Sequence, residues 1–457
     1  MAKYFFVGIG GSGMSSLAQI VRSRGHAVAG SDRNYDRGIN RSMFRTLRRY
    51  AVALYPQDGT GITNDVDRVI ISTAIESTIP DVAKACALGI PVVRRAEVLA
   101  EIFNVSRGIA VGGTSGKSTT TGMIGWLLYC SGLEPTIVNG GEMKNFETVN
   151  PPGNAYAGKS DLFVIEGDES DGTIVLYNPA VVVITNIAKD HKTLPELRHL
   201  FSHFALRARE CVIVNADCQE TSGLDLHQKH KITFSITEES DIRANKINCR
   251  NLASDFYIDD SHFYLKVPGI HNVYNALAAV AACKSLGIET SLMADALADF
   301  SGIRRRFDIV GEAAGIPVID DFAHNPDKIR ATISTVAPMY KRLLLVYQPH
   351  GFGPTAFLKD ELIETFSSVM RDEDILYMPE IYYAGGSASK TVSSRDLVEG
   401  IAASGRNAFF ISHRGEIADL VASEAASGDA VVVMGARDPS LTDFCRRILK
   451  NISKNFV

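Results

Sequence analysis

The sequence predicts an α/β protein built from three domains. Its 457 residues are about three times the ~150 residues of a typical domain. Short apolar runs that resemble strands alternate with segments of helical spacing along the whole chain, which is typical of parallel sheets covered by helices. Two glycine-rich loops each follow such a strand and open a helix, which favours nucleotide binding. With 46% hydrophobic and 22% charged residues, the chain has enough apolar material for buried cores.

We place the first domain at residues 1–104. It begins with an apolar run at 4–9 that ends in glycines, and helical spacing follows at 14–23. The other expected elements are strands at 27–30, 68–72 and 91–93 and a helix at 96–103. Strands that alternate with helices in this way indicate a doubly wound, Rossmann-like parallel sheet.

The second domain is expected at residues 105–308 and the third at 309–457. Strands of the second domain are predicted at 108–111, 162–165, 181–185 and 212–215, where continuous apolar runs suggest burial on both faces. Residues 231–266 are polar, alternating and rich in turns, and we expect a small antiparallel patch there, followed by a helix at 272–286. The third domain, with strands predicted at 318–320, 342–347, 375–378, 408–411 and 430–434, is again Rossmann-like.

Composition excludes several classes of protein. The net charge is −5, and the longest basic run, residues 304–306, is too short for a nucleic-acid footprint. The seven cysteines are odd in number and form no CxxC pair, which favours a reducing cytoplasm over a disulfide or zinc scaffold. No signal-peptide pattern opens the chain and no apolar stretch reaches 18 residues, so we expect neither export nor a membrane span.

The first glycine-rich loop matches G-x-G-x-x-G between a predicted strand and helix. Its glycines are Gly8, Gly10 and Gly13, and Asp32 follows near the end of the next strand. Glycines allow the backbone to approach a diphosphate, the helix start supplies N–H groups, and the acid can accept hydrogen bonds from ribose hydroxyls. NAD and UDP-sugars share a diphosphate, so the motif alone does not choose between them.

The second loop, residues 113–119, predicts an ATP site. Its backbone N–H groups can surround phosphates, Lys117 can neutralise them, and the Ser118 hydroxyl can bind Mg²⁺. The standard pattern has a glycine where Val111 stands, so this is a shortened variant. The predicted strand at 162–165 delivers Glu166, and Asp190 and His191 follow the strand at 181–185, at the sheet edge where a metal-binding carboxylate is expected.

These motifs resemble, in kind and in order, those of the Mur ligase family. The resembling stretches are 7–15, 30–32, 93–97, 113–119, 166–171, 185–187, 190–191, 268–276, 305–307, 320–326 and 348–350. They are spread over most of the chain, and the family's phosphate loop is the short form that Val111 indicates. Each motif alone is moderately specific for the family. Together, in this order along the chain, they are strongly specific for it.

The resemblance implies an ATP-dependent ligase that joins an amino acid to a carboxylate through an acyl phosphate. The most similar kind of member joins L-alanine to a UDP-linked sugar acid of the UDP-N-acetylmuramate type, in peptidoglycan precursor synthesis. The implied cofactors are ATP and Mg²⁺, and the implied partners are that sugar acid and the amino acid, with no nucleic acid or membrane. A monomer or a homodimer is expected.

Site residues are carried over from the family position by position. The implied UDP-sugar site contains Gly8, Gly10, Gly11, Ser12, Gly13, Met14, Ser15 and Asp32. The implied ATP site contains Gly113, Thr114, Ser115, Gly116, Lys117, Ser118, Thr119, Asn275, Arg306 and Asp321. Ser118, Glu166 and His191 are the implied metal ligands, and Lys117, Glu166, His191, Arg306 and His324 the implied catalytic residues. Asn275 is expected at adenine, Asp321 at ribose and His324 near the reacting groups.

Several positions depart from the family pattern. Ser115 stands where histidine is usual, and Ser118 replaces threonine. Gly351 and Pro354 stand where the alanine-adding member has arginines, and Arg437 stands where glycine is usual. The ATP chemistry therefore looks intact, while the choice of amino acid looks altered.

Other functions stay open at this stage. One is a paralogue of the same family with another acid or amine substrate; a ligase that recycles murein peptides fits the loop at 8–14 less well. Another is a nucleotide-binding regulator without ligase activity, which the presence of Lys117, Glu166 and His191 argues against. An NAD oxidoreductase would leave the second nucleotide loop without a purpose.

Overall fold

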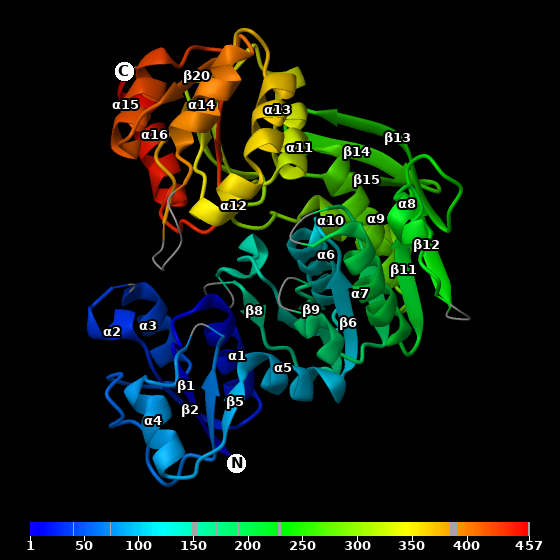
Figure 1. The fold of residues 1–457 in the computed structure, drawn as a ribbon. Coiled ribbons are helices and arrows are strands. Elements are labelled where there is room, and N and C mark those ends of the chain that lie inside the picture. The colour runs from blue at the N-terminus through cyan, green and yellow to red at the C-terminus, as the bar shows by residue number, and fades with distance from the viewer. Residues whose placement is uncertain are drawn as a thin grey trace. The chain divides into compact units, whose positions relative to one another are not determined.

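The computed structural model describes residues 1–39, 41–73, 75–148, 153–169, 172–189, 192–226, 230–383 and 391–455 (Figure 1). It confirms an α/β fold of three domains, one around each of three sheets. The chain forms two compact units. The first comprises residues 1–246, 256–264 and 273–301, and the second comprises 247–255, 265–272 and 302–457.

The N-terminal sheet is parallel throughout, with strand order β3-β2-β1-β4-β5. Its strands are β1 (Lys3–Val7), β2 (Ala27–Ser31), β3 (Ala53–Tyr55), β4 (Arg68–Ile71) and β5 (Val92–Arg94), and its helices are α1 (Ser12–Ser23), α2 (Arg33–Asp36), α3 (Arg41–Arg49), α4 (Pro80–Ala87) and α5 (Arg95–Asn104). Alternate residues of β1 face opposite cores: Phe6 packs in the core that contains Leu17 of α1, and Phe5 in the one that contains Val82 of α4. Helices therefore cover both faces of the sheet, as the alternating pattern predicts.

The central sheet has ten strands, in the order β15-β14-β13-β12-β11-β10-β6-β9-β7-β8. They are β6 (Arg107–Gly112), β7 (Thr136–Val138), β8 (Ala155–Tyr156), β9 (Leu162–Glu166), β10 (Val181–Ile184), β11 (Cys211–Asn215), β12 (Lys231–Ser235), β13 (Ile242–Arg250), β14 (Ala253–Ile258) and β15 (Ser261–Leu265). The helices are α6 (Lys117–Cys130), α7 (Leu194–Leu206), α8 (Gln219–Ser222), α9 (Ile270–Lys284) and α10 (Thr290–Ala298), with 3-10 turns η1 (Lys144–Phe146) and η2 (Thr173–Leu176). All four residues of β10 are buried, in keeping with a strand inside a covered parallel sheet.

The antiparallel patch is smaller than the sequence predicts. Strand β12 pairs parallel with β11 and with β13, so it extends the parallel sheet. Within residues 231–266, the antiparallel part consists of β13, β14 and β15, which are joined by the two-residue loops at 251–252 and 259–260. Elsewhere in this sheet, β7 pairs antiparallel with β8. Alternating polarity marks any half-exposed strand, whichever way its neighbour runs, and for that reason the pattern at 231–235 was misleading.

The C-terminal sheet has the order β16-β17-β21-β18-β19-β20. Its strands are β16 (Asp308–Ala313), β17 (Ile316–Asp321), β18 (Arg342–Tyr347), β19 (Ile375–Met378), β20 (Asn407–Phe410) and β21 (Asp429–Met434). Its helices are α11 (Pro326–Val336), α12 (Phe352–Phe357), α13 (Lys359–Val369), α14 (Ser394–Ala403), α15 (Arg414–Glu424) and α16 (Leu441–Asn455), with a 3-10 turn η3 (Ala337–Met339). Leu343 and Leu345 of β18 pack in the core with α11, α13 and α14, whereas Leu344 and Val346 pack with α15 and α16. The edge strand β16, which the sequence did not reveal, runs antiparallel to β17.

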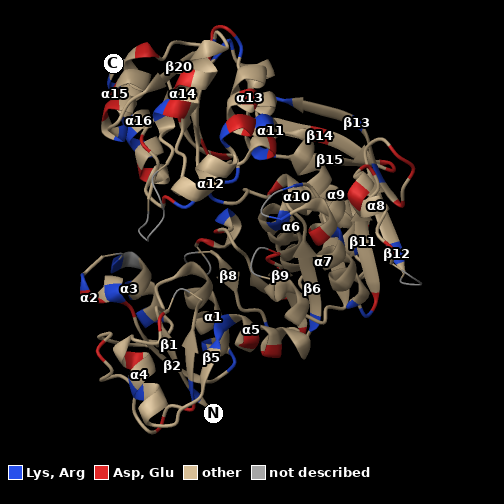
Figure 2. Cartoon of the chain, in the orientation of Figure 1, with Lys and Arg blue, Asp and Glu red and all other residues tan. Residues whose placement is uncertain are grey.

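Charge is spread over both units. Figure 2 shows Lys and Arg interspersed with Asp and Glu along the described elements. The seven cysteines are free. No helix among the described residues is long and apolar enough to cross a membrane.

Candidate functional site

The phosphate loop needs glycine at two positions. Gly113 follows β6 with φ +133°, and a Cβ there would lie 2.1 Å from the hydroxyl oxygen of Thr185. Gly116 precedes α6 with φ +83°, and its Cβ would lie 2.2 Å from Oδ1 of Asn275. A side chain at either position would meet both a strained backbone and a polar atom, so the loop closes tightly over the start of α6.

Asn186, which follows β10, holds the outer part of this loop. Its Oδ1 accepts hydrogen bonds from the Thr114 hydroxyl at 2.7 Å and from the backbone N–H of Ser115 at 3.0 Å. Its Nδ2 donates to the carbonyl oxygen of Ser115 at 3.0 Å, and the Thr185 hydroxyl donates to the same oxygen at 2.6 Å. Thr114 and Ser115 are thus fixed by the neighbouring strand end. Residues 185–187 are one of the motifs of the sequence. Nothing in the sequence indicated that Thr185 and Asn186 would form hydrogen bonds with the phosphate loop.

Lys117 forms an ion pair inside the site. Its ammonium nitrogen lies 2.8 Å from Oε2 and 3.1 Å from Oε1 of Glu169, and it donates to the carbonyl oxygen of Gly113 at 2.8 Å. Glu169 is itself tethered, because Lys192 donates to its carbonyl oxygen at 2.9 Å. The side chains of Lys117 and Glu169 are only 14% and 7% exposed, so water screens the pair weakly. Glu169 was not among the predicted site residues.

Ser118 and Glu166 are both connected to the turn after β7. The Nδ2 of Asn139 donates to the carbonyl oxygen of Ser118 at 2.9 Å, and the N–H of Gly140 donates to Oε2 of Glu166 at 2.9 Å. His191, the third predicted metal ligand, lies outside the described residues. Within the described ranges, no three His, Cys, Asp or Glu side chains gather as a metal cluster.

Asn275 lies on α9 and contacts the phosphate loop. Its Oδ1 accepts a hydrogen bond from the Thr120 hydroxyl at 3.3 Å, and the residue is 5% exposed. Thr119 is also largely buried, at 8% exposure. The structure therefore brings Asn275 to the loop at 113–119, next to Gly116.

The N-terminal glycine loop is closed by Asp32. One carboxylate oxygen accepts the N–H of Gly10 at 2.9 Å, and the other accepts the N–H of Asn34 at 2.8 Å and so caps α2. Gly8 has φ +78°, and a Cβ on Gly10 would lie 2.8 Å from the Phe44 ring. Asp32 is 6% exposed and shapes the loop, a second role beside the expected contact with ribose.

The start of α1 is where this loop can meet an anion. The first N–H groups of a helix, here from Ser12 onward, have no partner within it. The side chains of Met14 and Ser15 are buried, so only their backbone can serve a ligand, while Gly11 and Ser12 are exposed. The guanidinium of Arg95 lies beside Gly13, with Nη1 3.1 Å from the place of a Gly13 Cβ. Arg95 lies in the motif at 93–97 but was not among the predicted site residues.

The remaining predicted residues lie in the second unit. Both carboxylate oxygens of Asp321 accept backbone N–H groups, from Phe307 at 2.6 Å and from Ala323 at 2.7 Å. Burial raises the pKa of Asp321, although these two donors and the charge of Arg306 oppose the rise. The guanidinium carbon of Arg306 lies 4.3 Å from the centroid of the Phe322 ring.

His324 follows Phe322 on the same loop after β17. Its Nδ1 lies 3.0 Å from the carbonyl oxygen of Phe322, and its ring centroid is 5.5 Å from that of His350, which follows β18. The Tyr347 hydroxyl donates to the carbonyl oxygen of His324 at 3.2 Å. Two histidines thus meet at the carboxyl edge of the C-terminal sheet, where ligands bind in open α/β sheets.

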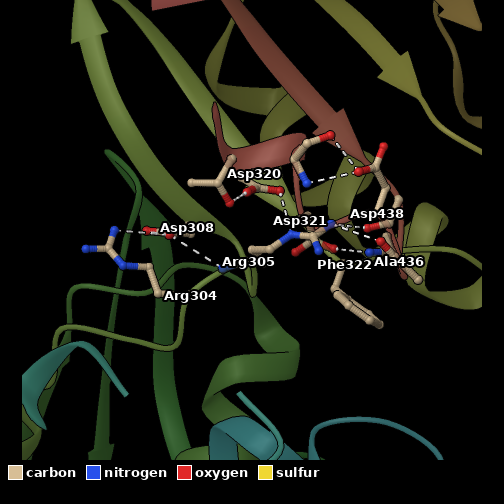
Figure 3. A network of polar contacts seen from close by, with 12 residues as sticks. Arg304, Arg305, Asp308, Asp320, Asp321, Phe322, Ala436 and Asp438 are labelled. Atoms are coloured by element: carbon tan, nitrogen blue, oxygen red, sulfur yellow. Dashed lines mark hydrogen bonds and ion pairs between the residues drawn. The ribbon is translucent and has the colours of Figure 1, made fainter. Parts of the chain in front are cut away.

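An arginine network supports that edge (Figure 3). Arg305 donates to the carbonyl oxygens of Gly435 at 2.7 Å and Ala436 at 3.2 Å, and its Nε lies 3.4 Å from Asp320 Oδ1. Gly351, one of the departures from the family pattern, has φ +70° just before α12. An arginine there would have to take a backbone conformation that side chains disfavour, so glycine suits this turn.

Comparison with known proteins gives one consistent result. The Mur ligase family catalytic domain matches residues 3–107, the Mur ligase middle domain matches 111–283, and the Mur ligase glutamate ligase domain matches 305–437. Two relatives are the UDP-N-acetylmuramate–L-alanine ligases of Sulfurihydrogenibium sp. (strain YO3AOP1) and Aquifex aeolicus (strain VF5). They are 34% and 33% identical to this chain, and each alignment covers 99% of this chain and 98% of the relative.

Solved structures agree with the sequence relatives. The UDP-N-acetylmuramate–alanine ligase MurC from Thermotoga maritima is similar over 100% of both chains, with a TM-score of 0.80 and 25% identity. A murein peptide ligase from Psychrobacter arcticus shares the fold over 99% of both chains, with a TM-score of 0.69 and 24% identity. This chain belongs to the Mur ligase family and is an ATP-dependent ligase.

Proposed function

We propose that this protein joins L-alanine to the carboxylate of UDP-N-acetylmuramate at the expense of ATP, as a step of peptidoglycan precursor synthesis. The names of its full-length relatives support this assignment. The observation that carries it is the presence of two glycine loops in one compact unit, at 8–13 and 113–119, each between a strand and a helix. Asn154 of the central domain donates to the carbonyl oxygen of Ser12 at 2.9 Å, so the two loops belong to connected domains.

ATP is proposed to bind the loop at 113–119. Its backbone N–H groups and Lys117 would hold the phosphates, and Asn275 would contact the adenine side. Arg306 and Asp321 of the second unit are proposed to complete the site at the transferred phosphate and the ribose. Binding would require Lys117 to give up at least one of its present contacts, because its three N–H donors already face both carboxylate oxygens of Glu169 and the carbonyl oxygen of Gly113.

Mg²⁺ is proposed to bind Ser118 and Glu166, with His191 as a further ligand. The donor chemistry fits, because a hydroxyl and a carboxylate are the hard oxygen ligands that Mg²⁺ prefers. Glu166 Oε2 already accepts the N–H of Gly140, and Oε1 accepts no hydrogen bond from the described residues. Bound Mg²⁺ would neutralise charge on the phosphates as phosphoryl transfer proceeds.

UDP-N-acetylmuramate is proposed to bind the N-terminal loop. The exposed Gly11 and Ser12 and the first N–H groups of α1 would receive the diphosphate, with Gly8, Gly10 and Gly13 giving the backbone its close approach. Arg95 adds a positive charge beside Gly13. Met14 and Ser15 would contribute their backbone alone, because their side chains are buried.

The chemistry follows from the poor reactivity of a carboxylate. The γ-phosphoryl group of ATP is transferred to a carboxylate oxygen of the sugar acid, giving an acyl phosphate and ADP. The amine nitrogen of alanine attacks the acyl carbon, a C–N bond forms, the C–O bond to phosphate breaks, and phosphate leaves. Lys117 and Arg306 stabilise the negative charge that spreads over the transferring group.

His324 is proposed to accept the proton that the amine loses. Its Nδ1 faces the carbonyl oxygen of Phe322, which can only accept, so in the neutral ring Nδ1 carries the hydrogen and Nε2 the lone pair. A histidine in this tautomer is suited to act as a general base at neutral pH.

We further propose domain boundaries at 104/105 and 308/309, action in the cytoplasm where ATP and UDP-sugars are made, and a monomer or homodimer as the working assembly. The test of function is phosphate release from ATP in the presence of Mg²⁺ and UDP-N-acetylmuramate, with each of the twenty amino acids in turn. Release with L-alanine supports the proposal. Release with glycine or serine but not alanine would make the protein a paralogue with another acceptor, and no release with any amino acid would contradict ligase activity.

A further inference from the structure

The loop after β21 carries a free arginine at the carboxyl edge of the C-terminal sheet. Arg437 is exposed, and its side chain makes no hydrogen bond, ion pair or ring contact with any described residue. Two other arginines near this edge already have partners. Arg305 donates hydrogen bonds to Asp320 and to two carbonyl oxygens, and Arg414 forms an ion pair with Asp438. The charge of Arg437 is therefore available to a ligand.

The backbone on both sides of Arg437 is held in place (Figure 3). On one side, Arg305 donates to the carbonyl oxygens of Gly435 and Ala436. On the other, Asp438 accepts the N–H of Ser440 at 2.9 Å and its hydroxyl at 2.6 Å, besides its ion pair with Arg414. Ala436 and Asp438 are 3% and 4% exposed. The backbone that carries Arg437 is thus fixed, while its exposed side chain can turn towards a ligand.

The position of this loop points to the reacting groups. Strand β21 lies between β17 and β18, so Arg437 follows the strand between those that lead to His324 and His350. The N–H of Gly435 donates to the carbonyl oxygen of Asp321 at 3.1 Å, and the N–H of Gln348 donates to that of Met434 at 2.9 Å. The three loops are thus joined at one edge, the usual place for ligands in such sheets.

We propose that Arg437 binds the α-carboxylate of the incoming amino acid and so favours amino acids over amines that lack a carboxylate. This inference rests on the proposed function. Three substrates bring anionic groups, and the phosphates of ATP and of the UDP-sugar have candidate loops in the first unit. The carboxylate of the amino acid has no such loop, and a guanidinium matches its two oxygens with parallel N–H donors.

The test is a kinetic comparison of Arg437→Gln and Arg437→Lys with the unmodified enzyme, using L-alanine and L-alaninamide, which lacks the carboxylate. The KM for L-alanine should rise on the order of tenfold or more in Arg437→Gln, with kcat changed less. Arg437→Lys should recover part of the loss, because it keeps the charge but not the paired donors. The KM for alaninamide should be the same in all three.

The matched control is Arg446→Gln, because Arg446 is an exposed arginine on α16 that forms an ion pair with Asp443. It should leave every KM unchanged. An unchanged KM for L-alanine in Arg437→Gln would overturn the proposal, as would an equal loss with alaninamide. A rise confined to the KM of ATP or of UDP-N-acetylmuramate would assign the guanidinium to a phosphate or to the sugar acid instead.

A second experiment distinguishes failure of the proposed function from failure of the Arg437 proposal. If the unmodified enzyme releases no phosphate with any amino acid, saturation-transfer NMR of L-alanine and alaninamide, with UDP-N-acetylmuramate and a non-hydrolysable ATP analogue present, still measures binding. Loss of the L-alanine signal in Arg437→Gln would support the carboxylate site without ligation. Equal signals in both proteins would overturn it.

Discussion

Lys117 and Glu169 form a nearly buried ion pair at the phosphate loop, with 2.8 Å between Nζ and Oε2. The lysine expected to hold the phosphates of ATP is thus paired with a carboxylate. ATP has to compete with Glu169 for this ammonium group, and Glu169 then loses its partner in a site with little water. Nucleotide affinity and the stability of the free enzyme are therefore linked through this pair.

Replacing Glu169 by Gln should tighten ATP binding and destabilise the free protein. The amide keeps the shape of the side chain but removes the competing charge, so we expect Kd for ATP to fall by up to about tenfold. Calorimetry and melting curves with and without ATP measure both effects. Glu220→Gln, which breaks the ion pair with Arg198 in the same unit, is the matched control. Unchanged or weaker ATP binding in Glu169→Gln would refute competition.

Removing Lys117 should abolish turnover and leave UDP-sugar binding intact. Because Lys117→Ala alone would bury an unpaired carboxylate, the cleaner variant also carries Glu169→Gln. We expect kcat/KM for ATP to fall by about 10²–10³-fold or more, while calorimetry gives an unchanged Kd for UDP-N-acetylmuramate. Lys159→Ala, at an exposed lysine, serves as control. Parallel loss of both activities would mean that the two nucleotide sites are not separate.

Asn186→Ala should loosen the phosphate loop. It removes the hydrogen bonds to the Thr114 hydroxyl and to both backbone groups of Ser115, so the KM for ATP should rise about tenfold. Asn145→Ala is a matched control, since Asn145 also bonds backbone groups, those of Asp299 and Ser301, away from the loop. If both variants change the KM for ATP equally, the effect is general destabilisation.

Asp217 should make the first unit sensitive to acid. Burial alone would raise its pKa, but hydrogen bonds from the backbone of Ile236 and Glu238 and from the hydroxyls of Thr237 and Tyr274 outweigh it and hold the pKa well below the usual range. A depressed carboxylate pKa adds stability above the unfolded pKa of about 3.9, and that stability is lost as the pH falls through the folded pKa. Stability should therefore decline below about pH 4.

The variant Asp217→Asn isolates this contribution. We expect it to be less stable than the unmodified protein at pH 7, by on the order of 2 kcal/mol, and to show a smaller decline in acid. Urea unfolding between pH 3 and 7 measures both. Parallel pH profiles for the two proteins would exclude Asp217 as the group responsible.

The sequence was sufficient for the parts of this fold that local patterns encode. Apolar runs such as 342–347 and the glycines at 113 and 116 correspond to strands and a loop that local backbone preferences explain. Strand β16, at the edge of its sheet, was missed. Strand β12 was assigned to the antiparallel patch because alternating polarity looks the same whichever way a neighbouring strand runs. Register and direction are decided by tertiary packing.

The residues of the candidate site also fall into those that the sequence predicts and those that only tertiary packing reveals. Spacing identified Lys117 and Glu166, but Glu169, Asn186 and Arg95 reach their positions only through the packing of separate strands and helices. The burial of Met14 and Ser15 likewise depends on the direction in which α1 faces its sheet. His191 lies outside the described residues, so its role stays a prediction.

The most direct test of the proposed acyl-phosphate mechanism traces the carboxylate oxygen atoms of the sugar acid. UDP-N-acetylmuramate labelled with ¹⁸O in its carboxylate is incubated with the enzyme, ATP, Mg²⁺ and L-alanine, and the released phosphate is analysed by mass spectrometry. An acyl phosphate predicts one ¹⁸O atom in each phosphate and one in the new amide, since the C–O bond to phosphate breaks when the amine attacks. Unlabelled phosphate formed along with the amide product would contradict carboxylate activation at this site.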